Sequence, residues 1–68
     1  MRVRNRTVLV EYVRLLGLSE RAVARQSGLS HSTVNHLMVG RRTTCSVQTA
    51  VAIERALGCP PGLLFSPD

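Results

Sequence analysis

The sequence contains no lysine and no tryptophan, and Tyr12 and Phe65 are its only aromatic residues. With so few aromatic side chains, the protein lacks the stacking surfaces on which proteins that bind single-stranded RNA usually hold the bases. Hydrophobic residues nevertheless make up 44% of the chain. The interior must therefore be built from Val, Leu, Ala, Ile and Met, and this set of side chains favours packed helices.

Acidic residues are also scarce. Four of them stand against nine arginines, which gives a formal net charge of +5, and they are scattered over four separate segments. No paired carboxylates, no Ser/His/Asp arrangement and no glycine-rich phosphate loop is visible, so general acid and base catalysis has little material to work with. The sequence predicts no enzyme and no cofactor, and the charge indicates a partner rich in negative charge.

Residues that bind metals are few and badly spaced. Cys45 and Cys59 stand apart, without a CxxC motif or a Cys/His ligand spacing. His31 and His36 are five residues apart, whereas ligands on one helix face are three or four apart. No metal site is predicted, and the cysteines are expected to be reduced, structural thiols, although their spacing leaves a single disulfide open.

Long apolar runs are absent too. No stretch approaches the roughly 18 to 20 residues of a membrane span, and the basic start is not followed by the apolar core of a signal peptide. The sequence predicts a soluble, cytoplasmic protein with no membrane partner.

The 68 residues form one small domain, which should bury about 60% of the surface that its unfolded chain exposes. We expect the domain to cover residues 7–66. Before it, Arg2, Arg4 and Arg6 alternate with uncharged residues, a strand-like spacing with too little else to build a sheet. Residues 1–6 are therefore predicted to be a flexible basic arm.

Apolar spacing and helix-ending residues predict an all-α fold. Helices are expected over residues 7–16, 20–27, 30–39 and 47–57, with a final apolar turn at residues 63–65. The first should bury the four apolar residues at helical spacing, which are Leu9, Tyr12, Val13 and Leu16. Serine stands where it can cap each of the other three, and glycine follows all four.

The helix from Ser30 to Val39 has an unusual outer face. Val34, Leu37 and Met38 share one side at about 100° per residue, so they should be buried. The remaining face is polar yet carries no Lys, Glu or other fully charged group. A helix surface that meets only water usually carries long charged side chains, so the short hydrogen-bonding groups indicate that another surface lies close by.

The run LSERAVARQSGLSHSTVNHLMVGRR resembles the helix-turn-helix of the lambda repressor, Cro and XRE-like bacterial regulators. Ala24, Gly28, Val34 and Leu37 match the family's packing alanine, turn glycine and core positions. The resemblance extends from about Leu9 through Phe65. It implies a compact bundle of four to five helices that binds double-stranded DNA.

The resemblance also implies which side chains touch the bases. The helix over residues 30–39 would enter the major groove, where base edges present distinct donors and acceptors. His31, Ser32, Asn35 and Thr33 are the predicted base contacts. Asn35 and Ser32 are the foremost of these, because an Asn amide can pair with adenine and a Ser hydroxyl can donate to either purine.

Phosphate contacts are expected around this helix, by the same resemblance. Many family members have Gln where Glu20 stands, and that Gln donates to a phosphate, whereas a carboxylate would repel it. The usual contact must then be replaced by neighbouring residues. The predicted backbone contacts are Arg41, Arg42, His36, Arg21, Ser30, Thr43, Arg2, Arg4 and Arg6.

These features together predict a transcriptional regulator of the small Cro or repressor kind, from a phage or prophage, that binds an operator. A competing interpretation is a protein-interaction module of the same fold, such as an antitoxin or an excision accessory factor. Apolar residues outside the expected core support it, namely Val8, Val10, Leu15 and Val39. A nonspecific RNA-binding protein is a weaker third possibility, and the sequence leaves open whether the protein forms a homodimer on DNA.

Overall fold

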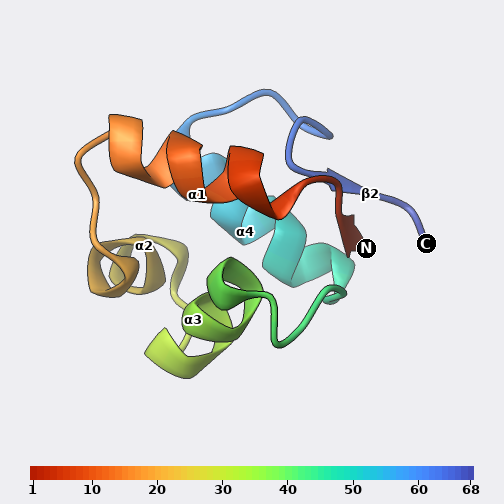
Figure 1. Cartoon of the computed structure of the whole chain (residues 1–68), viewed down its shortest axis with the longest axis horizontal. Coiled ribbons are helices and arrows are strands. Elements are labelled where there is room, and N and C mark those ends of the chain that lie inside the picture. The colour runs from red at the N-terminus through yellow and green to blue at the C-terminus, as the bar shows by residue number, and fades with distance from the viewer.

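The computed structural model describes residues 1–68, which form four helices and two very short strands (Figure 1). The elements in chain order are β1 (Arg2–Val3), α1 (Arg6–Leu15), α2 (Glu20–Ser27), α3 (His31–Val39), α4 (Val47–Leu57) and β2 (Phe65–Ser66). The predicted helical bundle is confirmed, and the limits of its helices agree to within one residue. The small sheet was not predicted.

Serine caps and left-handed glycines set the limits of the helices. Ser19 Oγ accepts a hydrogen bond from the backbone N–H of Ala22 at 3.0 Å, and Ser30 Oγ accepts one from Thr33 at 3.1 Å. These bonds satisfy N–H groups that have no partner inside the helix. After α2, Gly28 has a φ of 72°, which glycine adopts without steric cost, and it starts a tight turn into α3.

One apolar core joins the four helices to the segment that follows α4. The packing partners of α2 are α3 and α4, and α1 packs against α3. Burial of Val34, Leu37 and Met38 is confirmed. The core consists of Leu9, Val13, Val23, Ala24, Val34, Leu37, Met38, Ala50, Ile53, Leu57, Cys59, Leu64 and Phe65.

The end of α1 departs from the prediction. Leu9 and Val13 are buried and Tyr12 is half-buried, but Leu16 is 48% exposed. Helix α1 ends at Leu15, and the chain then turns toward α2. After that turn, Leu18 packs against the core, so the last turn of α1 extends beyond the core and leaves Leu16 in solvent.

The flexible arm predicted for residues 1–6 is wrong. Strand β1 pairs antiparallel with β2, with Val3 opposite Phe65, and the N–H of Val3 donates to the carbonyl of Thr43 at 2.9 Å. Val3 also packs against the core, and Arg6 is the first residue of α1. The segment is fixed because it gains backbone hydrogen bonds and apolar burial together. Both termini lie at this end of the molecule, away from α2 (Figure 1).

A buried carboxylate anchors the segment after α4. Glu54 is 5% exposed and forms no ion pair, but its Oε2 accepts backbone N–H groups of Gly62 at 3.0 Å and Leu64 at 3.1 Å. These bonds satisfy a charge that burial would otherwise penalise heavily. They hold Leu64 and Phe65 in the core, as predicted for this final turn, whereas Leu63 faces outward.

Both cysteines are free thiols, Cys45 half-buried and Cys59 buried. Burial raises the pKa of each thiol, so both stay protonated at neutral pH. None of the helices combines the length and the apolar character needed to cross a membrane.

Candidate nucleic-acid interface

Helices α2 and α3 form a helix-turn-helix unit (Figure 1). The N–H of Leu29 donates to the carbonyl of Ala24 at 3.0 Å, which closes the end of α2 across Gly28. Ala24, Val34 and Leu37 are all buried, and they fix the angle between the two helices. Packing of this kind holds α3 as a rigid element whose other side is free.

The outer face of α3 is polar and carries no acidic residue. His31 and Ser32 are exposed, and Thr33, Asn35 and His36 are half-buried. None of the five is enclosed in the core, so the face that the sequence sets apart is available to a partner. Short hydrogen-bonding side chains on a helix of this width suit the major groove of a duplex.

At the start of α3, two hydroxyls are already engaged with each other. Ser30 Oγ and Thr33 Oγ1 are 2.8 Å apart, and Ser30 also caps the helix. Side chains held this way have little freedom left to search for a base. Among the predicted base contacts, Thr33 is therefore the one whose side chain the structure occupies with a purely local bond.

Asn35 and His31 are brought together by a residue from α2. Glu20 Oε1 accepts a hydrogen bond from Asn35 Nδ2 at 2.9 Å, and the same oxygen lies 3.3 Å from His31 Nε2. The glutamate side chain is 29% exposed, so the cluster lies at the rim of the outer face. It joins the first turn of α2 to two consecutive turns of α3.

Sequence reasoning missed this role of Glu20. A glutamate in the first turn of a helix is fully explained by the helix dipole, so its presence signals nothing further. Asn35 is 15 residues away, and only the close packing of α2 on α3 brings them together. A signal was present, since Glu20 is the only acidic residue within the helix-turn-helix run, but the sequence did not reveal its partners.

Unpaired arginines lie beside α3. Arg41 and Arg42 follow the helix, and both are exposed, as is Thr43. The backbone N–H of Arg42 donates to the carbonyl of His36 at 3.1 Å, which folds this loop back onto the last turn of α3. Arg14 is the one arginine held in an ion pair, with Glu11 at 2.6 Å. The guanidinium groups beside α3 are therefore free to bind an anion.

The remaining predicted phosphate contacts are distributed over the surface. Arg21 is exposed in the first turn of α2. Arg2 lies in β1 and Arg6 begins α1, while Arg4 Nε donates to the carbonyl of Gly62 at 2.7 Å. Arg4 thus already has a partner in the protein, and the three arginines are held on the folded domain, where a flexible arm was predicted.

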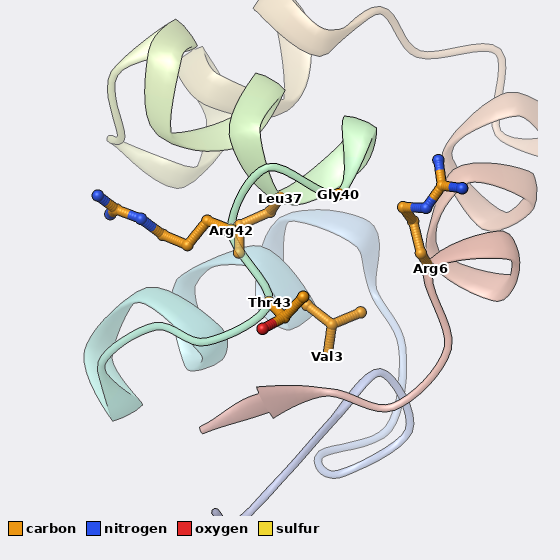
Figure 2. Close-up of a pocket in the computed structure, with 6 residues that line it drawn as sticks. All are labelled: Val3, Arg6, Leu37, Gly40, Arg42 and Thr43. Carbon is orange, nitrogen blue, oxygen red and sulfur yellow. The ribbon is translucent and has the colours of Figure 1, made fainter.

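A shallow pocket of about 200 Å³ lies at the carboxyl end of α3 (Figure 2). Figure 2 shows Arg6 and Arg42 on opposite sides of it, with the Arg42 side chain directed away from the other lining residues. The Arg6 side chain passes close to Gly40, where an added Cβ would lie 3.1 Å from Arg6 Cδ. The pocket brings α1, α3 and the following loop together, and it adds positive charge near the end of α3.

No group of three or more His, Cys, Asp or Glu side chains lies close enough to hold a metal ion. His31 Nε2 lies 3.3 Å from Glu20 Oε1. The surface offers hydrogen-bond donors and acceptors and positive charge, which are the means of recognising a nucleic acid.

Comparisons with known proteins agree with this geometry. A family model described as helix-turn-helix matches residues 9–64, which is most of the chain. No curated protein and no solved structure gives a significant match. Members of this family are DNA-binding domains and typically not enzymes. The chain belongs to the lambda repressor-like, XRE-type helix-turn-helix family of DNA-binding regulators.

Proposed function

We propose that the protein is a sequence-specific transcriptional regulator that inserts α3 into the major groove of a double-stranded operator. The observation that supports this most directly is the outer face of α3, which is polar, open and next to unpaired arginines. A helix of α3's diameter fits the major groove, and its outer side chains then reach base edges. The regulator is of the Cro or repressor kind, from a phage or prophage, and acts in the bacterial cytoplasm.

Base recognition belongs to the exposed half of α3. Ser32 and Asn35 lie one turn apart, so both side chains reach one stretch of the groove, with His31 at the leading end of the helix. Thr33 is the fourth candidate, and its hydroxyl must exchange its bond to Ser30 for a base.

Phosphates on either side of the groove are bound by residues around α3. The loop that follows α3 contains Arg41, Arg42 and Thr43, and Arg21 lies near the start of α2. Phosphates can therefore be bound from two separate parts of the helix-turn-helix. Ser30 and His36 lie at the two ends of α3. Arg2, Arg4 and Arg6 add charge from β1 and the start of α1. These contacts position the helix and carry no sequence information themselves.

Selection from a pool of random duplexes tests this function. The purified protein should enrich a single motif, and a scrambled version of that motif should bind much more weakly at the same salt concentration. Failure to enrich any motif would contradict sequence-specific recognition.

A protein-interaction module is the second candidate, because several apolar side chains remain in solvent. Leu15 is 75% exposed and Val47 58% exposed. An antitoxin or an excision accessory factor would use such a surface to bind a protein. The same selection separates the two functions, since a module of this kind would enrich no motif. Sedimentation with and without the motif tests whether a homodimer forms on DNA.

A further inference from the structure

The contact between Glu20 and Asn35 determines more than the packing of two helices. Asn35 Nδ2 donates to Glu20 Oε1 at 2.9 Å, and His31 Nε2 approaches the same oxygen at 3.3 Å. His31 and Asn35 are four residues apart, so they are neighbours along one face of α3. A single oxygen of Glu20 therefore contacts both Asn35 and His31, which are neighbours on the outer face of α3.

A carboxylate accepts hydrogen bonds and has none to donate when it is ionised. The amide nitrogen of Asn35 must then be the atom that faces Glu20, and its oxygen Oδ1 must face away. A glutamine in place of Glu20 would impose no such order, because its own amide can donate or accept. The charge at this position thus fixes which end of the Asn35 amide is presented to a partner.

On the basis of the proposed function, we propose that Glu20 is a positioning residue for base recognition. It holds the Asn35 amide with Oδ1 toward the groove, so that Asn35 selects a base with an exocyclic amino group, N6 of adenine or N4 of cytosine. Both amino groups are donors in the major groove, whereas guanine O6 and thymine O4 are acceptors. Guanine O6 or thymine O4 at that place would meet the Asn35 oxygen, which can only accept, with the Glu20 carboxylate close behind it.

The charge of Glu20 makes this arrangement a compromise between affinity and selectivity. A carboxylate that is 29% exposed at the rim of a DNA-binding face repels phosphates. The same group opposes the wrong bases by leaving their acceptors unpaired. Removing its charge should therefore strengthen binding to DNA in general while weakening the choice at one base pair.

The test compares Glu20→Gln with a control that changes the charge equally. Glu11→Gln also removes one negative charge, from an exposed glutamate on α1 that pairs with Arg14. Both variants should bind random duplexes more tightly than the wild type. Only Glu20→Gln should accept guanine or thymine at the base pair that Asn35 reads, with a loss of discrimination of about five-fold or more.

Base analogues identify the group that is read. The selected motif is synthesised with purine in place of adenine, or 2-pyrimidinone in place of cytosine, because each lacks only the amino group. At the position read by Asn35, this change should weaken the wild type by about five-fold or more and Glu20→Gln by clearly less. Thermal unfolding verifies that each variant folds. If Glu20→Gln does not fold, Glu20→Ala replaces it, and the Asn35 side-chain amide signals in a ¹H–¹⁵N spectrum of the wild type and this variant show whether the contact exists.

Two results would overturn the proposal while leaving the proposed function standing. In the first, Glu20→Gln selects the same motif as the wild type and keeps the same preference at every base pair. The other is a motif in which Asn35 contacts guanine or thymine. A wild type that enriches no motif would instead reject sequence-specific binding itself, so the two failures are distinguishable.

Discussion

At the scale of single residues, the side chains on the outer face of α3 differ in whether a hydrogen bond inside the protein already holds them. Ser32 is exposed, and the structure shows no side-chain hydrogen bond for it, whereas Thr33 is held by Ser30 and Asn35 by Glu20. Side chains held in advance lose less entropy when they bind, so they favour a single partner geometry. Asn35 is therefore the residue at which a substitution should have the most specific effect.

Replacing Asn35 by Ala should weaken binding to the preferred operator by about 1 to 3 kcal/mol and relax the preference at one base pair. Titration of the selected motif and its single-base variants measures both effects. Ser32→Ala provides a comparison on the neighbouring turn and should relax a different base pair. An equal loss on every sequence would instead assign Asn35 to the phosphate contacts.

The two thiols predict a dependence of stability on alkaline pH. Burial raises the pKa of Cys45 and of Cys59, so the folded protein keeps both protons to a higher pH than the unfolded chain, whose thiols ionise near about 8.5. The protonated thiols thus stabilise the fold fully below about pH 8.5, and the free energy of unfolding should fall as pH rises through that value. Denaturant titrations on both sides of it measure the fall, which Cys59→Ala should make shallower. A stability that is flat across this range would argue against the shifted thiols.

At the scale of secondary structure, the serine caps make a clean comparison possible. Ser30 caps α3 and bonds to Thr33, and Ser46 caps α4 and bonds to Thr49 in the same way. Ser30→Ala and Ser46→Ala should each lower the free energy of unfolding by about 0.5 to 2 kcal/mol, because each leaves a helix N–H without its partner.

Their effects on DNA binding should differ. Ser30→Ala removes a hydroxyl that is a proposed phosphate contact at the leading end of α3, so affinity for the operator should fall. Ser46→Ala acts on α4 and should leave affinity unchanged at temperatures where the protein is folded. Equal losses of affinity would mean that only overall stability matters.

The elements that could be predicted from the sequence are those with local signals. Gly28 and Gly40 end helices through backbone conformations that glycine adopts freely, and Ser19 and Ser30 begin them, so chain neighbours alone decide these limits. The sheet could not be predicted, because Val3 pairs with Phe65 over 60 residues away and two-residue strands have almost no pattern. An alternating arginine segment looks the same whether it is solvated or paired.

The candidate site also has a part that could be predicted from the sequence and a part that could not. Which residues lie on the outside of α3 follows from helical periodicity, and the exposure of Ser32 agrees with it. The bond from Asn35 to Glu20 depends on how α2 packs on α3, and periodicity contains no information about that.

At the scale of the whole molecule, Glu54 connects α4 to the segment that closes the core. Its carboxylate accepts from Gly62 and Leu64, and a Glu54→Gln amide would place an N–H₂ group against those donors. The free energy of unfolding should fall by about 1.5 to 3 kcal/mol, as for hydrogen bonds to a charged group. Denaturant unfolding measures this loss. Glu11→Gln, on the exposed surface, should change stability little. A similar loss in free energy of unfolding for the two variants would show that the buried hydrogen bonds of Glu54 do not stabilise the fold.

The net charge of +5 leads us to expect that the affinity of the protein for DNA depends strongly on salt concentration. Each phosphate neutralised by an arginine releases condensed counterions, so the logarithm of affinity falls linearly with the logarithm of salt concentration. If six of the exposed arginines bind phosphates, the slope should be about −5, because each contact contributes about −0.9. Binding measured over a range of salt concentrations gives the slope directly.

Single substitutions then assign the charges to positions. Arg42→Ala should make the slope less steep by about 0.9, the contribution of one phosphate contact. It should weaken binding to all sequences alike, because the phosphate groups do not depend on the base sequence. Arg14→Ala is the matched control, because its guanidinium is paired with Glu11 on α1. An affinity that ignores salt would be incompatible with phosphate binding by these arginines. A slope near −5 that Arg42→Ala lowers and Arg14→Ala leaves unchanged would place the duplex along the loop that follows α3.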